Sequence, residues 1–278
     1  MFHPPVTLGP FEVHRLLGEG GMATVYEATH RQSGLELVLK FLRHSQGRPE
    51  QLLRDEIHTV SALNHPSILR VFDQGIVDED AASQSKGVLK SGSLYYAMEL
   101  ADLGSLRDHT GTVDWPFLRR VLVAILDALA HAHARGVIHC DIKPENVLLA
   151  SHHSGIPRVL LADFGIALVR ARLDERGGPE VLMGSPRYMA PEQFEGWWRD
   201  FCPATDLYAL GCLAYELASN TTPYRHSHYQ ALAFAHVMET PKPPKPSFTV
   251  PRGFVDWVMR LLVKSPKGRF ALAADARY

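Results

Sequence analysis

The hydrophobic pattern of this chain changes its period once, near residue 104. Before that point, apolar and β-branched residues form short strand-like stretches, and after it they recur at helical spacing. The predicted strands cover residues 11–17, 24–29, 36–42, 68–74 and 94–100. A chain with this pattern is expected to form a small strand-rich unit followed by a larger helical unit.

The same pattern predicts the helices and one long connection. A helix is expected over about 49–63, within the strand-rich part. Another begins at Asp114 and ends at Gly136, because aspartate favours helix starts and glycine favours helix ends. The polar, serine-rich segment 76–93 is predicted to be a mobile loop. Further helices are predicted at 203–219, 228–239 and 252–263, with short strands at 147–150 and 158–162.

The composition argues against several classes of protein. Lys plus Arg total 29 and Asp plus Glu total 30, so the net charge of −1 offers no basic surface for nucleic acid or for a membrane. No apolar stretch reaches the roughly 18 residues that span a bilayer, and the first residues do not resemble a secretory signal. Cys140, Cys202 and Cys212 have no paired spacing, so we expect no disulfide framework and a cytoplasmic setting.

A glycine-rich turn and a lysine stand out in the strand-rich part. The stretch LLGEGGMATV contains Gly18 and Gly20, where backbone amides can approach a phosphate chain, although a plain hairpin turn is an alternative. Lys40 ends an apolar strand and needs an anionic partner, since a buried unpaired ammonium is costly. Glu56 is the expected partner, with Asp55 second; a surface ion pair is the alternative.

Two loops of the helical part concentrate carboxylates and an amide. The first is HCDIKPEN, residues 139–146, and the second is the triplet DFG that begins at Asp163. Aspartate and asparagine oxygens are hard ligands of the kind Mg²⁺ takes beside substrate phosphates. Lys143 can neutralise charge on a phosphoryl group during its transfer. These loops therefore predict phosphoryl-transfer chemistry.

In this order, the motifs resemble the bacterial Ser/Thr protein kinases of eukaryotic type, also called Hanks-type, from about residue 11 to 270. The resemblance implies one kinase domain over 1–278 with a bilobal α+β fold. Its small β-rich N-lobe, with one key helix, would cover about 1–99, its hinge about 100–103 and its larger helical C-lobe about 104–278. ATP, Mg²⁺ or alternatively Mn²⁺, and protein substrates are the implied ligands.

The resemblance also implies roles in the reaction. Lys40, paired with Glu56, would hold the α and β phosphates of ATP. Asp141 would orient the acceptor hydroxyl and take its proton, and Lys143 would steady the γ-phosphate. The implied metal ligands are Asn146 and Asp163. The implied ATP-binding residues are Gly18, Gly20, Val25, Val38, Lys40, Met98, Glu99, Ala101 and Leu148.

Other positions are expected to shape the substrate site or to pack. Ser185 would contact Asp141 and Lys143, a pattern typical of kinases that act on serine and threonine rather than tyrosine. Phe164 is expected to contact His139, and Arg269 to pair with Glu192. The implied structural residues are His139, Phe164, Glu192, Asp206 and Arg269.

The chain departs from the family pattern at two important positions. Val38 stands where alanine is usual, which narrows the adenine pocket, and Cys140 stands where many kinases have the arginine that grips a phosphorylated loop. Between Asp163 and the APE triplet, only Ser185 and Tyr188 carry hydroxyls. We therefore expect that loop phosphorylation does not activate the protein, and that control comes from expression, a regulatory partner or domains beyond residue 278.

Several alternatives remain open. A pseudokinase that binds nucleotide and acts as a scaffold is the alternative function, but the catalytic set is complete, which favours the enzyme. A redox-active thiol at Cys140 is disfavoured by the neighbouring carboxylate of Asp141. Some of the fifteen histidines could bind zinc, but ordinary packing is the favoured interpretation. The PKPPKP stretch could dock to an aromatic groove, but a rigid loop is favoured.

Overall fold

The structure is a computed structural model that describes residues 6–20, 23–42, 61–85, 88–164, 184–196 and 200–277. Contacts divide the chain into two compact units. Unit 1 comprises Met1–Asn64 and Leu69–Leu100, and unit 2 comprises His65–Ile68 and Ala101–Tyr278. The boundary at residue 100 lies close to the point where the hydrophobic period changes in the sequence.

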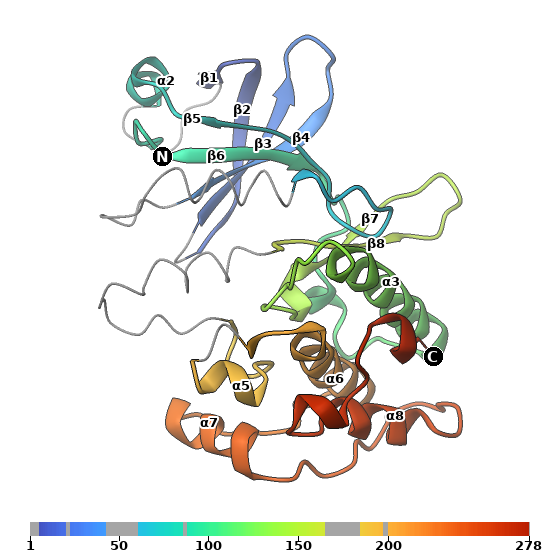
Figure 1. Ribbon diagram of the computed structural model, residues 1–278. Helices are drawn as coiled ribbons and strands as arrows, with labels where there is room; N and C mark the ends of the chain where they lie inside the picture. The colour runs from blue at the N-terminus through green and yellow to red at the C-terminus, as the bar shows by residue number, and fades with distance from the viewer. Residues whose placement is uncertain are drawn as a thin grey trace. The chain divides into compact units, whose positions relative to one another are not determined.

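Unit 1 is built on one antiparallel sheet (Figure 1). Its strand order is β1-β2-β3-β4-β6-β5, so most strands pair with their neighbours in sequence. The strands are β1 Val6–Leu8, β2 Phe11–Glu19, β3 Ala23–His30, β4 Glu36–Leu42, β5 Val71–Ile76 and β6 Leu94–Glu99. The predicted strands are present, and β5 begins and ends slightly later than expected.

The two faces of β4 have different roles. Leu37, Leu39 and Phe41 belong to the hydrophobic core of unit 1 and are nearly inaccessible to solvent. Val38 and Lys40 alternate with them and therefore point to the opposite face of the sheet. The residues expected to bind nucleotide thus lie on the face of β4 away from this core.

The segment expected to be a mobile loop contains a short helix, so that expectation was wrong. Helix α2 covers Glu79–Gln84. It begins because the Asp78 side chain accepts a hydrogen bond of 2.7 Å from the backbone amide of Ala81. Ala81 and Leu89 are buried in the core of unit 1, which provides the apolar contact that a polar composition did not suggest.

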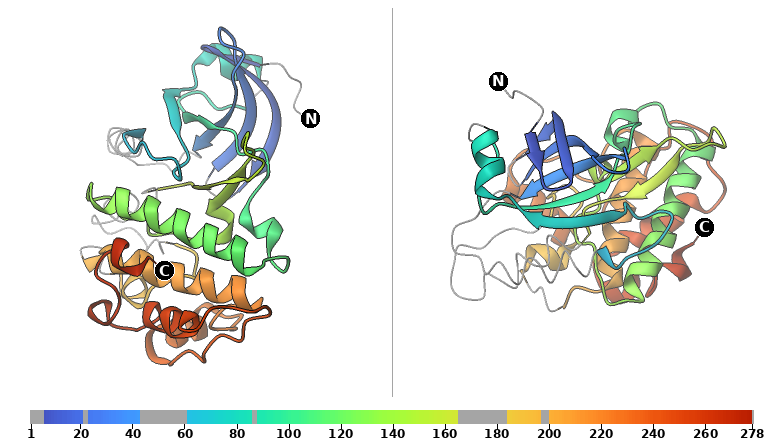
Figure 2. Two further views of the ribbon diagram at one scale, coloured as in Figure 1. Left: turned by 90° about the vertical axis from the view of Figure 1, so that its right-hand side faces the viewer. Right: turned by 90° about the horizontal axis from the view of Figure 1, so that it is seen from above.

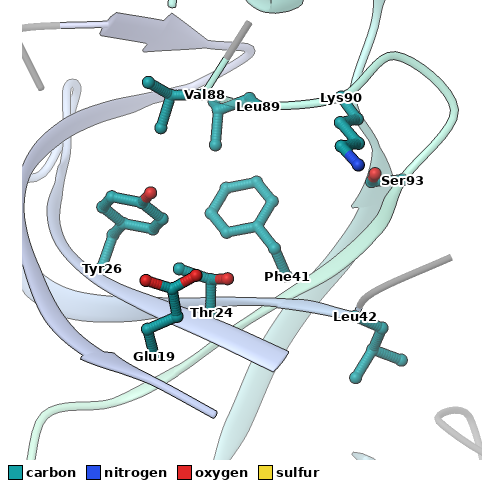
Figure 3. A pocket seen from close by; sticks show the side chains of 9 residues that line it. All are labelled: Glu19, Thr24, Tyr26, Phe41, Leu42, Val88, Leu89, Lys90 and Ser93. Atoms are coloured by element: carbon teal, nitrogen blue, oxygen red, sulfur yellow. The ribbon is translucent and has the colours of Figure 1, made fainter. Parts of the chain in front are cut away.

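A cavity of about 390 Å³ lies beside the segment 88–93 in unit 1 (Figure 3). The rings of Tyr26 and Phe41 line it in an edge-to-face contact with centroids 5.6 Å apart, and Leu89 lies nearby. Because Phe41 alternates with Lys40 along β4, its ring points to the face opposite Lys40. Glu19 and Thr24 of the glycine-rich stretch also line the cavity.

Unit 2 is mainly helical, and its long helix α6 runs beside α3 (Figure 2). Helix α3 starts as expected, since the Asp114 side chain accepts a hydrogen bond of 2.9 Å from the backbone amide of Phe117. Helix α6 is buried along almost its whole length, so it forms the centre of the unit. The α-helices are α3 Trp115–His133, α5 Pro191–Phe194, α6 Pro203–Ser219, α7 Tyr229–Met238 and α8 Phe254–Leu261.

The remaining elements of unit 2 are short. Strands β7 Val147–Ala150 and β8 Arg158–Leu161 form the predicted antiparallel pair. The 3₁₀ turns are η1 Leu106–His109, η2 Pro144–Asn146, η5 Pro266–Gly268 and η6 Ala274–Ala276. Within the described ranges, no helix is long and apolar enough to cross a membrane.

Some expectations fall outside the described residues. Most of the helix predicted over 49–63 does so, together with Glu56, the expected partner of Lys40. Gly165, the last residue of the DFG triplet, and the segment 166–183 that follows it do so as well.

Candidate active site

Asp141 and Lys143 form the centre of a hydrogen-bonded cluster in unit 2. The Lys143 ammonium donates to Oδ2 of Asp141 over 2.7 Å and to the Ser185 hydroxyl over 2.9 Å. Ser185 makes no direct hydrogen bond to Asp141, contrary to our expectation, because Lys143 lies between them. The other oxygen, Oδ1 of Asp141, is buried and has no hydrogen-bond partner among the described residues. This oxygen is available to accept a proton from a bound hydroxyl.

The side chain of Asn146 is oriented by the same cluster. Its amide nitrogen donates to the backbone oxygen of Asp141 over 2.8 Å and to Oδ2 of Asp141 over 3.2 Å. The amide oxygen makes no hydrogen bond within the described part of the chain, so it is the atom left for a ligand. Because Mg²⁺ prefers oxygen ligands, this arrangement fits a divalent metal.

Asp163 follows β8 and adopts a left-handed backbone conformation with φ of 63°. A residue other than glycine rarely adopts this conformation, and such residues concentrate at functional sites. Its neighbour Phe164 is buried against His139, with ring centroids 4.6 Å apart, which is the contact expected from the sequence. The Nε2 atom of His139 also bonds to the carbonyl oxygen of Ala162 over 2.8 Å. These contacts tie the loop of Asp163 to that of Asp141.

Asp206 on α6 holds the backbone that leads to Asp141. Its carboxylate accepts from the amide of His139 and from the amide of Cys140, each over 2.8 Å. A third contact of 2.8 Å joins it to Nε2 of His133 on α3. Burial alone would raise the pKa of Asp206, but the hydrogen bond and charge of His133, with a further contribution from His139, hold that pKa below its usual value.

Cys140 is also in the left-handed region, with φ of 65°, and its side chain is buried. Burial raises the pKa of the Cys140 thiol well above its usual value, and the carboxylates of Asp206 and Asp141 raise it further. Since the thiolate is the reactive form, the environment opposes reactivity of this cysteine. The environment therefore disfavours a redox-active thiol at Cys140.

Arg269 and Glu192 form the expected pair, and the pair is buried. The two terminal nitrogens of Arg269 donate to the two oxygens of Glu192 over 2.7 and 2.9 Å. Arg269 also donates to the backbone oxygens of Val263, Ala204 and Lys264. This network connects the start of α5 to the end of the chain.

The glycine-rich turn lies between β2 and β3 in unit 1. Gly18 pairs with Val25 across the two strands, and the amide of Gly20 donates to the carbonyl oxygen of Ala23 over 2.9 Å. A Cβ atom added at Gly18 would meet open space, so packing within the protein does not require glycine there. Close approach of a ligand to the backbone is a physical reason for glycine at this position.

The other expected nucleotide residues of unit 1 lie on β4 and β6. Val38 pairs in register with Met98 and is buried, while Lys40 pairs with Tyr96. The Lys40 ammonium lies 5.9 Å from the centre of the Tyr96 ring. The amide of Glu99 donates to the carbonyl oxygen of Arg70 over 2.9 Å, so it is already used.

Two expected nucleotide residues belong to unit 2. Leu148 lies in β7 and forms an isolated antiparallel bridge with Ser105. The backbone amide of Ala101 makes no hydrogen bond to any residue in the described ranges. This amide is therefore available to a ligand, as expected for the residue that would contact adenine.

Sequence reasoning missed an ionic cluster centred on Arg107. Its guanidinium donates to Glu145 over 2.9 Å, to Glu216 over 2.8 Å and to the hydroxyl of Tyr188 over 2.7 Å. Glu145 was visible within the HCDIKPEN motif, but Arg107 and Glu216 are 109 residues apart. No local pattern predicts contacts across such a separation.

Comparison with known proteins adds independent information. The profile described as protein kinase domain matches residues 11–276. Serine/threonine-protein kinase Pkn1 of Myxococcus xanthus is 33% identical over 280 residues, which cover 98% of this chain and 38% of that protein. PknB of Mycobacterium leprae is 32% identical over 285 residues, covering 100% and 43%. PknA of Mycobacterium tuberculosis is 33% identical over 274 residues, covering 95% and 59%. The chain spans less than two thirds of each of these proteins.

Proposed function

Because this chain belongs to the protein kinase family, we propose that it transfers the γ-phosphoryl group of ATP to serine and threonine hydroxyls of protein substrates. The observation that carries the proposal is the cluster of Asp141, Lys143 and Ser185, in which one buried carboxylate oxygen has no partner among the described residues. The alternative is a nucleotide-binding scaffold without activity. A scaffold of this kind is expected to lack a charged catalytic residue, and Lys40, Asp141 and Asp163 are all present.

The cluster suggests how these residues act in the transfer. Oδ1 of Asp141 accepts the proton of the acceptor hydroxyl as the oxygen attacks the γ-phosphorus, and the bond between that phosphorus and the leaving ADP oxygen breaks. Lys143 stays bound to Oδ2 of Asp141 and brings positive charge next to the transferred group. The pair thus combines positioning with charge neutralisation.

Lys40, Asn146 and Asp163 are the residues we propose for ATP and metal. Lys40 would neutralise the α and β phosphates, in partnership with Glu56, and the oxygen atoms of Asn146 and Asp163 would bind Mg²⁺. When bound, the metal neutralises charge on the phosphates. The all-oxygen donor set supports Mg²⁺, with Mn²⁺ as the second choice.

The sharpest test of the proposal is the variant Asp163→Asn. Phosphate transfer from radiolabelled ATP to a mixture of protein substrates is expected to fall by orders of magnitude, because a charged metal ligand is lost. Asp275→Asn, at an exposed aspartate of η6, is the matched control and should keep the wild-type rate. Lys40→Met should lower transfer in the same way as Asp163→Asn.

The outcomes separate the enzyme from the scaffold. Equal turnover of Asp163→Asn and wild type would show that the assigned metal site is wrong. A wild-type protein that binds ATP with Mg²⁺ or Mn²⁺ but transfers no phosphate under any of these conditions would establish the pseudokinase reading instead.

We propose that loop phosphorylation does not activate this kinase. The Tyr188 hydroxyl is bonded to Arg107 and Glu216, and the Ser185 hydroxyl accepts from Lys143. Phosphate on either oxygen would displace these hydrogen bonds, and on Tyr188 it would meet the carboxylate of Glu216. Treatment with a phosphatase should therefore leave the specific activity within about twofold. Stoichiometric phosphate on either residue, whose removal silences the enzyme, would contradict the proposal.

We further propose control by a regulatory partner or by regions outside this chain, and a cytoplasmic setting. The curated relatives are longer than this chain, which supports control by further regions. The cysteines Cys140, Cys202 and Cys212 are all free thiols, which supports a reducing compartment.

A further inference from the structure

A groove in unit 2 adjoins the proposed acceptor site. It encloses about 820 Å³ and is lined by residues that include Lys143, Asn146, Ser185, Arg187, Glu145 and Glu216. We call it the acceptor groove, because Lys143 and Ser185 belong both to it and to the cluster around Asp141. A polypeptide whose hydroxyl reaches Asp141 has to place its neighbouring residues in or near this groove.

The two carboxylates of the acceptor groove share the guanidinium of Arg107. Arg107 donates to Oε1 of Glu145 and to Oε1 of Glu216, and Tyr188 donates to Oε2 of Glu216. Only 12% of the Glu216 side chain is exposed, so its charge is largely shielded from an incoming peptide. A lysine or arginine of a substrate would have to compete with Arg107 and Tyr188 for Glu216.

Arg187 brings a positive charge to the acceptor groove and has no ion-pair partner among the described residues. Its side chain is exposed and makes no hydrogen bond or ion pair with any residue in the described ranges. Its backbone is held on both sides, since Ser185 is bonded to Lys143 and the amide of Tyr188 donates to the carbonyl oxygen of Ser185 over 2.8 Å. The guanidinium is therefore a cation carried on a held backbone that lines the acceptor groove.

We propose that Arg187 makes this kinase select serines and threonines that lie near an acidic residue. Arg187 is two residues from Ser185, a span of at most about 7 Å, and an extended peptide advances about 3.3 Å per residue. We therefore expect the acidic residue of the substrate within about three residues of the serine or threonine that accepts the phosphate. A carboxylate is the chemical group that matches a guanidinium, because two parallel hydrogen bonds can form. The inference rests on the function proposed above and names its class of substrate.

The test compares peptides that differ only in charge. A serine peptide carries glutamate, alanine or lysine at each of the three positions on either side of the serine. One glutamate position is expected to raise kcat/KM about 2- to 5-fold over alanine, the range of one exposed ion pair. The preference should weaken as salt is raised.

Variants of Arg187 assign the preference to this side chain. In Arg187→Ala the ratio of the glutamate to the alanine peptide should fall to about one, and in Arg187→Glu the lysine peptide should become the better substrate. Lys267→Ala removes an exposed positive charge outside the acceptor groove and should keep the wild-type ratio. Equal losses for all peptides in Arg187→Ala would show a structural role and overturn the inference, as would a wild-type enzyme indifferent to glutamate.

A binding measurement separates this inference from the proposed function. Fluorescence anisotropy with labelled peptides that carry alanine in place of the serine reports binding without transfer. Tighter binding of the glutamate peptide, lost in Arg187→Ala, supports the inference even where no phosphate is transferred. Phosphate transfer with no dependence on glutamate in either assay overturns the inference and leaves the kinase function standing.

Discussion

The neutral, buried imidazole of His236 is expected to make this fold sensitive to acid. His236 lies on α7 with no exposed surface, stacked on Phe194 and in edge contact with Tyr224. Its Nδ1 atom lies 3.0 Å from the hydroxyl of Tyr208, and its Nε2 atom has no partner among the described residues. Burial, with the nearby charge of Lys264, lowers the pKa of His236 to about 3.

The size of the effect follows from the two protonation equilibria. A histidine in an unfolded chain has a pKa near 6.5, so between pH 6.5 and 3 the unfolded state binds the extra proton and the folded state does not. The contribution of His236 to stability is therefore complete above about pH 6.5 and is lost as the pH falls. At pH 4.5 the loss amounts to about 2–3 kcal/mol, at about 1.4 kcal/mol per pH unit.

The assay is urea unfolding at pH 7.0 and pH 4.5, compared between wild type and His236→Asn. Asparagine does not titrate in this range and keeps a polar group near the Tyr208 hydroxyl, so the variant is less stable at pH 7.0 but loses less on acidification. The difference between the two losses should be about 2–3 kcal/mol. His153→Asn, at an exposed histidine, is the control and should behave as wild type. Equal acid losses in wild type and His236→Asn would refute the reasoning.

Two further predictions concern the buried ion pair and the adenine pocket. Glu192→Ala leaves Arg269 buried without its carboxylate and should lower the free energy of unfolding by about 3–5 kcal/mol, whereas Glu27→Ala, which breaks the exposed pair with Arg15, should cost at most about 1 kcal/mol. Similar losses in urea unfolding for both variants would contradict the role of burial. Val38→Ala should lower the KM for ATP because two methyl groups leave the pocket, and an unchanged or raised KM would show that the pocket already accommodates valine.

Elements with strong local signals could be predicted closely. Helix α3 carries an aspartate cap at its start and apolar residues at helical spacing, and the observed bounds Trp115–His133 lie close to those expected. Helix α2 was missed because its cap, Asp78, lies in a polar stretch in which only Ala81 is buried within the helix. Its stability comes from packing on the sheet, which a composition argument does not see.

Some contacts of the candidate site could be predicted from the sequence, and others could not. The contacts of Ser185 with Lys143 and of His139 with Phe164 involve motif residues, so a family pattern was enough to anticipate them. The Arg107 cluster was not foreseen, because its members are spread over a long stretch of sequence and meet only through the tertiary fold. The specificity inference depends on that cluster, so it required the structure.

The contact of Asp206 with the backbone at residues 139 and 140 has a consequence for which side chains position 140 can carry. The carboxylate accepts a hydrogen bond from the backbone amide of residue 140, a group that every amino acid except proline supplies. This hydrogen bond next to Asp141 thus does not involve the side chain at position 140. Another side chain at position 140 keeps this bond if it fits the buried site and the left-handed backbone, with φ of 65°. Cys140 occupies such a position.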